Sequence, residues 1–525
     1  MYKIVVSDPL EATGLAMLRD SGHEVIEVAA EDKARLPEII ADADALVVRS
    51  GTKVTADLLR AGKALRVVGR AGIGVDNVDT RAATELGILV VNAPTANLIS
   101  ATEHTFALLL AVARNVPVAD ADIKTGAWNR KKFVGTELQA KKLGVIGFGR
   151  IGQAVARRGR AFDMEILAYD PHLDDDHIRA RDALPRSLDA LLAEADVITL
   201  HVPLTDGTRN LLDAERLGAV KQGAILINCA RGGVVDEDAL YAQLESGRIA
   251  AAGVDVFAEE PPTDRRIADH PRVVATPHLG AQTREAQVRI STQTAKMVLA
   301  ALGGSLAVTA VNLPFRPAGT AGEPYLVLAE KLGRLAGLLG EGALRRVAVE
   351  LHGLDEALHV PIQIAALKGA MGFLGEGVNY VNADTLARER GIEVVRSVSD
   401  AAAPYPNLVR VEVADAQGSH MVAGTLFLDR EPRIVTFDDY PLEFRPKGHL
   451  LIVRNQDIPG VVGRLGTTLG EAGVNIAEIH LARRPQSDQA VAVVRLDQEP
   501  SDEVVTAVQA IDGVTHVRKL YVGRV

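Results

Sequence analysis

The glycine-rich turn GFGRIG, from Gly147 to Gly152, constrains the fold of this chain more than any other feature. It follows the apolar run Leu143 to Ile146 and opens a helix-like segment. In a strand, turn and helix unit, such glycines let the backbone approach a pyrophosphate closely, and the helix N-terminus attracts its charge. The pattern predicts a dinucleotide site at Gly147, Gly149, Arg150, Ile151 and Gly152, although a phosphate-free structural turn is the alternative.

A carboxylate after the next apolar run distinguishes between the two nicotinamide dinucleotides. Met164 to Tyr169 predicts a second strand, and Asp170 follows it directly. A carboxylate at this place suits the ribose hydroxyls of NAD and repels the 2′-phosphate of NADP. We therefore expect NAD as the cofactor.

Length and composition restrict the class of protein. The 525 residues predict roughly three or four domains, and 47% apolar with 24% charged residues is typical of a globular chain. A net charge of −10 argues against a nucleic-acid partner. Cys229 is the only cysteine, so we expect no disulfide and no metal site, and a cytoplasmic location. The first residues predict a strand rather than an export signal, and no apolar run predicts a membrane span.

Alternating apolar runs and helix-like segments predict two α/β units before the midpoint of the chain. One extends to about residue 95 and the other to about Ala275, followed by a helix from about Thr283 to Leu302. The segments that begin at Ala43 and Ala195 share a plan, so a weak internal duplication and chance similarity both remain open. Proline and glycine in FRPAGTAGEP, from Phe315 to Pro324, predict a linker.

The rest of the chain predicts two further domains. Residues 325–445 mix helix-like and strand-like runs without a nucleophile, metal or phosphate motif, which favours a structural or effector domain. From Gly448 onward the order of elements is βαββαβ, which is typical of a ferredoxin-like sheet with its helices on one face.

Arg231 lies in NCARGG, directly after the apolar strand Ala224 to Ile227. Open α/β sheets bind ligands at the carboxyl ends of their strands. A guanidinium there can hold a carboxylate through two hydrogen bonds and polarise a neighbouring carbonyl. We interpret Arg231 as a substrate ligand; a surface ion pair is the alternative.

His278 in TPHLGA also follows an apolar strand, Val273 to Ala275. Imidazole titrates near neutral pH and therefore suits proton exchange with a hydroxyl or ketone during hydride transfer. Glu260 is a candidate partner that would orient the ring and favour its protonated form. A His considered alone is more often a structural residue, and a Glu considered alone is more often a solvated surface residue.

In this order, GFGRIG, Asp170, NCARGG, AGVDVFAEEP and TPHLGA resemble the D-isomer-specific 2-hydroxyacid dehydrogenases. The resemblance implies that Arg231 binds substrate, that His278 is the acid/base and that Glu260 is its partner. It also implies cofactor contacts at Val202, Pro203, Cys229, Ala230, Arg231, Asp255, His278, Gly280 and Ala281.

The same resemblance implies that one domain is inserted into another, with hydride transfer in the cleft between them. Residues 1–96 and 286–314 would form a flavodoxin-like substrate-binding domain, and residues 97–285 a Rossmann-type NAD domain.

Within the family, the chain resembles the long-form D-3-phosphoglycerate dehydrogenases. Several cations hold a doubly charged phosphate best, although isolated basic residues are usually just solvated. The resemblance implies substrate contacts from Arg49, Ser50, Arg70, Gly72, Ile73, Gly74, Asn97 and Arg130. In the family, the residue at the position of Arg130 can reach the active site of a neighbouring subunit, which implies a homo-oligomer, either a dimer or a tetramer.

The two C-terminal domains also carry a resemblance. Residues 448–525 resemble an ACT domain, an amino-acid-sensing fold, with Asp457, Gly460 and Asn475 at its effector loop, while Asn455 replaces the aromatic or His residue of some relatives. Residues 317–445 resemble an α+β intervening domain that binds substrate allosterically. Inhibition by L-serine and a purely structural, dimer-forming ACT domain both remain open.

The resemblance implies oxidation of 3-phospho-D-glycerate to 3-phosphohydroxypyruvate with NAD, the first step of L-serine biosynthesis. A glyoxylate or hydroxypyruvate reductase would share the catalytic residues without needing Arg49 and Arg70. An NAD-sensing scaffold or corepressor is a further alternative, which the complete Arg231, Glu260 and His278 set disfavours.

Overall fold

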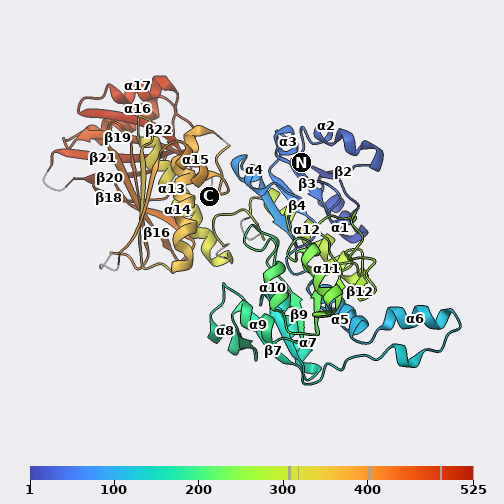
Figure 1. The fold of residues 1–525 in the computed structure, drawn as a ribbon. Coiled ribbons are helices and arrows are strands. Elements are labelled where there is room, and N and C mark those ends of the chain that lie inside the picture. Colours follow the sequence, from blue (N-terminus) through green and yellow to red (C-terminus); the bar gives the residue numbers. More distant parts are fainter. Residues whose placement is uncertain (306–308, 317–318, 376, 400–403, 485–486, 524–525) are drawn as a thin grey trace.

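The computed structural model describes residues 1–305, 309–316, 319–375, 377–399, 404–484 and 487–523. Within these ranges, four β-sheets follow one another along the sequence, two in each half of the molecule (Figure 1). None of the helices in the described ranges combines the length and the apolar character that a membrane crossing requires.

The first sheet is wholly parallel and has the strand order β2-β1-β3-β4-β5. Buried apolar strands such as Ala45–Val48 are typical of a parallel sheet that is covered on both faces. Its elements are β1 (Lys3–Val6), α1 (Ala12–Asp20), β2 (Glu24–Glu27), η1 (Ala30–Arg35), α2 (Leu36–Ile39), β3 (Ala45–Val48), α3 (Ala56–Ala61), β4 (Val67–Arg70), α4 (Thr80–Glu85) and β5 (Leu89–Asn92).

The second sheet is also parallel, with the order β12-β11-β10-β9-β6-β7-β8. The order reverses between β6 and β9, where such sheets open a ligand crevice. Its elements are β6 (Lys142–Ile146), α7 (Arg150–Ala161), β7 (Glu165–Tyr169), α8 (Asp175–Arg179), β8 (Leu184–Pro185), α9 (Leu188–Glu194), β9 (Val197–Leu200), α10 (Ala214–Ala219), β10 (Ala224–Asn228), α11 (Glu237–Ser246), β11 (Ile249–Val254) and β12 (Val273–Ala275).

Two long helices connect these sheets. Helix α5 (Leu98–Ala113) leaves the first sheet and packs on α7 and on strands β10 and β11 of the second. Helix α12 (Arg284–Leu302) returns and buries Ala295, Val298 and Leu302 against the first sheet. The second sheet is therefore inserted into the domain built on the first. Helix α6 (Val116–Lys124) and the turn η2 (Arg130–Lys132) form an arm that projects away from both sheets (Figure 1).

The third sheet is mixed, with the order β14-β13-β15-β16-β17-β18. Helix α13 packs along α14 and covers this sheet. The elements are α13 (Gly319–Leu339), β13 (Arg346–His352), α14 (Glu356–Ala370), η3 (Gly372–Leu374), α15 (Ala383–Glu389), β14 (Glu393–Val398), β15 (Leu408–Ala414), β16 (Ser419–Phe427), β17 (Glu431–Phe437) and β18 (Tyr440–Phe444).

The linker prediction for Phe315 to Pro324 is wrong over most of its length. Helix α13 begins at Gly319, so Pro324 lies inside it, and residues 317–318 are outside the described ranges. Burial of Leu326, Leu328 and Leu332 in the core under the third sheet outweighs the poor helix propensity of glycine and proline.

The fourth sheet is antiparallel, with the order β20-β21-β19-β22 of a ferredoxin-like fold. One face packs on helices α16 and α17. The other face shares a core with the third sheet, in which Leu450, Ile452 and Val493 join Phe437 and Phe444. The elements are β19 (His449–Gln456), α16 (Val461–Glu471), β20 (Ile476–Arg483), β21 (Gln489–Leu496), α17 (Asp502–Gln509) and β22 (Val514–Tyr521).

The two halves of the molecule meet at a small contact between α4 and α15 (Figure 1). There Asn379 Nδ2 donates a hydrogen bond to the carbonyl of Gly87 at 2.6 Å, and Phe315 and Tyr380 make an edge-to-face ring contact. The predicted fold class is confirmed, with two parallel α/β layers followed by an α+β layer and a ferredoxin-like sheet.

Candidate active site

Glycine is required at two places in the turn that opens helix α7. Gly147 has a φ of +88°, which side chains rarely adopt. A Cβ at Gly152 would lie 2.1 Å from the carbonyl oxygen of Gly147, so the helix packs directly on the turn. Gly149 precedes the helix and faces open space. The geometry leaves room for a pyrophosphate at the helix N-terminus.

The Asp170 carboxylate lies beside this turn, at the end of β7. Its Oδ2 accepts a hydrogen bond from the amide of Phe148 at 2.9 Å, and its Oδ1 accepts one from the amide of His172 at 3.0 Å. These bonds hold the carboxylate next to the phosphate turn, where ribose hydroxyls would bind.

The other residues predicted to contact the cofactor follow neighbouring strands of the same sheet. They therefore lie along one edge, beginning at the topological switch between β6 and β9. Val202 and Pro203 follow β9, Cys229 and Ala230 follow β10, Asp255 follows β11, and His278, Gly280 and Ala281 follow β12.

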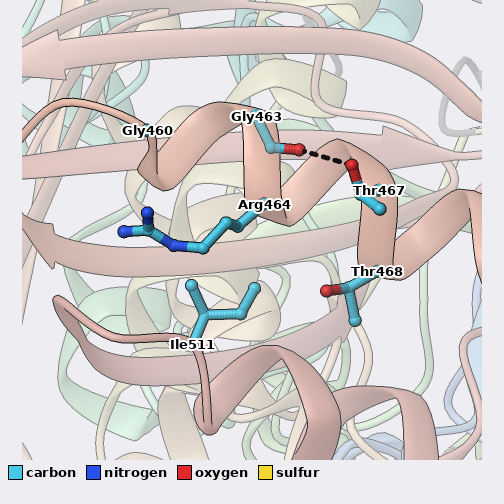
Figure 2. A pocket seen from close by; sticks show the side chains of 6 residues that line it. All are labelled: Gly460, Gly463, Arg464, Thr467, Thr468 and Ile511. Carbon is cyan, nitrogen blue, oxygen red and sulfur yellow. Dashed lines mark hydrogen bonds between the residues drawn. The ribbon is translucent and has the colours of Figure 1, made fainter.

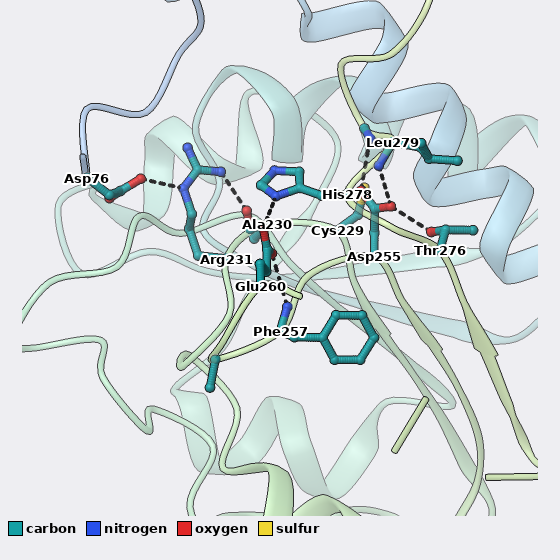
Figure 3. Close-up of polar contacts among 12 residues, drawn as sticks. Asp76, Cys229, Ala230, Arg231, Asp255, Phe257, Glu260, Thr276, His278 and Leu279 are labelled. Atoms are coloured by element: carbon teal, nitrogen blue, oxygen red, sulfur yellow. Dashed lines mark hydrogen bonds and ion pairs between the residues drawn. The ribbon is translucent and has the colours of Figure 1, made fainter. Parts of the chain in front are cut away.

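The structure brings His278 and Glu260 into contact (Figure 3). The His278 Nδ1 atom lies 2.7 Å from Glu260 Oε2. Burial raises the pKa of the Glu260 carboxyl, but the hydrogen bond and the charge of His278 outweigh that effect, and the pKa falls below its usual value. Because Nδ1 is engaged by the carboxylate, Nε2 is the ring atom left to exchange a proton with a substrate.

His278 has a left-handed backbone, with φ of +56°. For a residue other than glycine this conformation costs about 1–3 kcal/mol and persists only when surrounding contacts impose it. The Thr276, His278 and Leu279 amides all donate hydrogen bonds to Val254 or Asp255. The chain leaving β12 is thus held firmly against the end of β11.

Arg231 reaches across from the second α/β domain to the first. Its Nε donates to Asp76 Oδ2 at 2.9 Å, and its NH1 donates to the carbonyl of Ala230 at 2.6 Å (Figure 3). A Cβ at Gly74 would lie 2.0 Å from Arg231 NH2, so the glycine leaves room for the guanidinium in this position. The amides of Ile73 and Gly74 donate no hydrogen bond within the described ranges, which leaves them available to an anion.

Arg49 and Arg70 add positive charge at the same place. Arg70 is largely buried, and its pKa is lowered to about 10, first by desolvation and then by the charges of Arg231 and Arg49. The Arg70 Nε and Asn97 Oδ1 atoms are buried without a hydrogen-bond partner in the described part of the chain. An unpaired donor such as Arg70 Nε beside two further cations is an expected feature of an anion site before its ligand binds. Asn97 Oδ1 can only accept a hydrogen bond, and no described contact brings Asn97 to the three arginines.

Two predicted substrate residues are less closely tied to this cluster. Ser50 is exposed, and no contact of its side chain with the cluster is described. Arg130 is exposed in η2, on the projecting arm, and is not brought to the cluster by any described contact of this chain.

Three residues of the site, Asp76, His104 and Thr276, were missed by sequence reasoning. Asp76 belongs to the GRAGIGVDNVD segment and pairs with Arg231. His104 and Thr276 both contact the buried carboxylate of Asp255. A polar side chain directly after β12 was a signal for Thr276, whereas His104 lies on a helix far away in sequence and had none.

The predicted effector residues lie in the domain of the fourth sheet, where two of them, Asp457 and Asn475, contact other side chains. Asp457 Oδ2 is 3.0 Å from Arg483 Nε, and Asn475 Nδ2 donates to Asp497 Oδ2 at 2.6 Å. Gly460, with φ of +93°, lines a shallow hollow of about 460 Å³ (Figure 2). The other residues lining the hollow are Gly463, Arg464, Thr467, Thr468 and Ile511.

Three family models match separate parts of the chain. Residues 106–280 match the NAD binding domain of D-isomer specific 2-hydroxyacid dehydrogenases, and residues 322–438 match the intervening domain of D-3-phosphoglycerate dehydrogenase. Residues 449–513 match the ACT domain. The NAD-binding model covers the glycine turn and reaches Gly280, beyond His278.

Curated relatives are similar over the whole chain. D-3-phosphoglycerate dehydrogenase from Methanocaldococcus jannaschii is 42% identical over 98% of this chain and 99% of its own length. The Bacillus subtilis enzyme of the same name is 38% identical over 99% of both chains. The crystal structure of the TT0316 protein from Thermus thermophilus is 37% identical, covers 59% of this chain and 99% of its own, and has a TM-score of 0.54.

The order of the three matched domains agrees with the similarity to these relatives over their full length. The chain therefore belongs to the D-isomer specific 2-hydroxyacid dehydrogenases, in the group of D-3-phosphoglycerate dehydrogenases that carry an intervening domain and an ACT domain.

Proposed function

We propose that this chain oxidises 3-phospho-D-glycerate to 3-phosphohydroxypyruvate with NAD, the first step of L-serine biosynthesis. The observation that carries the proposal is the cluster of Arg49, Arg70 and Arg231 at the carboxyl ends of two sheets. A substrate with a carboxylate and a phosphate would neutralise this cluster. The full-length similarity to D-3-phosphoglycerate dehydrogenases supports the same substrate.

Each residue of the site would have a separate role in the reaction. Arg231 and the amides of Ile73 and Gly74 would hold the carboxylate, while Arg49, Arg70 and Asn97 would orient the phosphorylated end. His278 Nε2 would accept the hydroxyl proton as the C2 hydrogen leaves as a hydride. Bound NAD supplies the hydride acceptor. Glu260 stabilises the positive charge that His278 gains, so the proton and the hydride both have a destination.

Two substitutions test the phosphate assignment. Arg49→Ala and Arg70→Ala each remove a cation, and a lost charge-assisted contact of about 1.5–3 kcal/mol corresponds to roughly a 10- to 100-fold loss of kcat/KM for phosphohydroxypyruvate. Hydroxypyruvate, which has no phosphate, should lose much less. If both variants leave the kinetics of phosphohydroxypyruvate unchanged, the phosphate assignment is wrong.

The alternatives have their own tests. A glyoxylate or hydroxypyruvate reductase would turn over the unphosphorylated acids better than phosphohydroxypyruvate. An NAD-sensing corepressor would bind NADH without turnover. His278→Ala should abolish turnover and spare NADH binding in the enzyme we propose, whereas a corepressor would have no turnover to lose.

We also propose that the ACT layer binds L-serine and lowers activity, through Asp457, Gly460 and Asn475. The hollow beside Gly460 supports a ligand near this loop (Figure 2). In a single chain, Asp457 is paired with Arg483 and Asn475 with Asp497, so serine would have to compete for these partners. If serine changes neither activity nor thermal stability, the ACT layer is structural.

The projecting arm supports a homo-oligomer. Trp128 is 76% exposed and Val134 is 81% exposed, and Val116 and Ile123 on α6 are also exposed. Apolar side chains gathered on an arm are typical of an interface, and Arg130 beside them would then face a neighbouring subunit. Sedimentation should give a dimer or tetramer, and Trp128→Glu should shift the oligomer towards monomer.

We place the protein in the cytoplasm, where its free cysteine would stay reduced.

A further inference from the structure

The buried carboxylate of Asp255 connects several segments around the active site. The side chain has no solvent exposure. Its Oδ1 accepts hydrogen bonds from the amide of Leu279 at 2.7 Å and from Thr276 Oγ1 at 2.6 Å, and its Oδ2 accepts one from the amide of Gly280 at 2.9 Å (Figure 3). The carboxylate is therefore hydrogen-bonded to the chain on both sides of His278, to Thr276 before it and to Leu279 after it.

His104 supports the carboxylate from a different element. It lies on α5, and its Nε2 is 3.1 Å from Asp255 Oδ1 and 3.0 Å from Thr276 Oγ1. Because an ionised carboxylate only accepts hydrogen bonds, Nε2 must carry the proton and donate it. Thr276 in turn donates to Asp255, so the His104 proton can be shared between the two oxygens.

The burial of Asp255 explains why this donor matters. Burial raises the pKa of the Asp255 carboxyl, but the hydrogen bonds of His104, Thr276 and Leu279 together with the nearby His104 ring outweigh it and lower the pKa. His104 is the one imidazole that contacts this carboxylate within the described ranges, and its side chain is only 17% exposed. Losing it would leave a buried charge with one donor fewer.

We propose that His104 is a positioning residue for the reaction: through Asp255 and Thr276 it holds the segment from Thr276 to Gly280 in the shape that imposes the left-handed backbone of His278. This inference rests on the proposed function, because it assumes proton transfer by His278. His104 acts on the orientation of the His278 ring and contacts neither the Arg231 cluster nor the glycine turn in any described interaction.

A metal site is the competing interpretation of the same residues. His104, Cys229 and Asp255 place one ligand atom each within 4.8 Å of one another. However, both Asp255 oxygens already accept backbone amides, and Cys229 Sγ donates to Oδ2 at 3.6 Å. A metal ion would displace these bonds and release the His278 segment, so the arrangement favours hydrogen bonding.

The test compares His104→Leu with His104→Gln in the full-length enzyme. Leucine removes the donor, and we expect kcat to fall about 10- to 100-fold because the acid/base is displaced. The KM for phosphohydroxypyruvate should stay within about twofold, because the Arg231 cluster is untouched. Glutamine offers an amide donor at a similar distance from the backbone, and it should restore at least half of the lost kcat on a logarithmic scale.

A matched control comes from another buried histidine of the same domain. His270 pairs with Glu245 Oε1 at 3.0 Å, away from the site residues. His270→Leu loses a similar contact, so it should lower the melting temperature with little change in kcat. The thermal unfolding of each variant separates misfolding from a positioning effect.

Three outcomes would overturn the proposal. In the first, His104→Leu has a kcat within twofold of the parent enzyme. In the second, both variants are folded but His104→Gln does not restore the kcat that His104→Leu loses. In the third, EDTA inactivates the parent enzyme and added Zn²⁺ restores its activity. A folded parent that reduces no NAD at all would instead contradict the proposed function, which keeps the two failures distinguishable.

Discussion

Arg70 is held where an isolated guanidinium is unfavourable. It is largely buried, lies near the charges of Arg231 and Arg49, and keeps an unpaired Nε. Such a group destabilises the free protein and becomes favourable once an anion binds. The stability of the site and its affinity for substrate therefore oppose each other at this residue.

Arg70→Met should stabilise the substrate-free protein and weaken substrate binding. The pKa of Arg70 in the folded protein, about 10, is well below the usual value of a guanidinium. The cation therefore destabilises the fold at all pH values below about 10, and this effect diminishes only above that pH. We expect the free energy of unfolding at pH 7 to rise by about 1–3 kcal/mol in denaturant titrations. Unchanged or lower stability with unchanged KM would contradict the strained-cation account.

Glu260→Gln should lower the rate of the oxidation. The Glu260 carboxyl has a lowered pKa, so its charge is present throughout the neutral range, and its Oε2 atom lies 2.7 Å from His278 Nδ1. Glutamine keeps an oxygen for this contact but removes the charge that stabilises the proton taken up by His278. A lost charge-assisted contact of about 1.5–3 kcal/mol corresponds to a fall of roughly 10- to 100-fold in kcat/KM at pH 7. The kcat/KM measured from pH 5 to pH 9 checks this, and values equal to those of the parent would show that Glu260 does not act on His278 electrostatically.

A site residue could be predicted when its role follows from the neighbouring sequence rather than from contacts with distant residues. Arg231 and His278 each follow an apolar strand, and the rule that ligands bind at the carboxyl ends of parallel strands predicts them from local sequence. Asp76 and His104 are defined by contacts with residues more than 150 positions away. Nothing local in the sequence indicates such contacts.

Strand β5 links the active site to the connection between the two halves. The side chain of Asn92, at its end, donates to the carbonyl of Ile73 in the substrate loop at 2.6 Å. Thr309 Oγ1 donates to the carbonyl of Asn92, and Asn312 Oδ1 accepts from the amide of Val90 at 2.8 Å. The chain that leaves the catalytic half is thus bonded along the strand that supports the substrate loop.

Asn312→Ala should disturb this strand. The Asn312 Nδ2 atom also donates to the carbonyl of Ile88 and to Thr84 Oγ1, so alanine removes three hydrogen bonds. We expect unfolding to become easier by about 1–3 kcal/mol and the KM for substrate to rise, with the Kd for NADH unchanged because the glycine turn is in the other domain. Asn312→Asp keeps the acceptor and should be intermediate. A KM equal to that of the parent would show that β5 does not influence the substrate loop.

The start of α13 shows why element boundaries were less predictable than element types. Proline and glycine near Pro324 indicate a linker locally, yet the helix includes them. Its burial depends on a sheet formed mostly by residues after 345, so tertiary packing decides the boundary.

The four sheets do not form four independent domains. The first two share the Arg231–Asp76 pair and the crossing helices α5 and α12. The last two share one hydrophobic core and further contacts, including Arg454 NH2 to Asp438 Oδ2 at 2.5 Å and Lys331 Nζ to the carbonyl of Pro446 at 2.8 Å. The sequence separates the ferredoxin-like element order but not this shared core, because the pattern of a strand does not reveal what covers each face.

Truncated chains should fold only where they keep both sheets of a pair, the first with the second or the third with the fourth. A chain ending at residue 314 keeps both parallel sheets and should fold, because the solved TT0316 protein covers 59% of this chain with 99% of its own length. It should also reduce NAD, because Arg231, Glu260 and His278 all lie within it. A chain ending at residue 445 would expose the face of Phe437 and Phe444 that the fourth sheet covers, and should aggregate. Solubility, circular dichroism and activity of both fragments check this, and a soluble, monodisperse 1–445 fragment would contradict the shared core.

The most direct test of the whole account is the substrate preference of the purified full-length protein. With NADH, kcat/KM for 3-phosphohydroxypyruvate should exceed that for hydroxypyruvate and for glyoxylate by about 100-fold, since roughly 3 kcal/mol of charge-assisted binding depends on the phosphate. Equal turnover, or faster turnover of the unphosphorylated acids, would contradict the assignment of Arg49 and Arg70 to a phosphate.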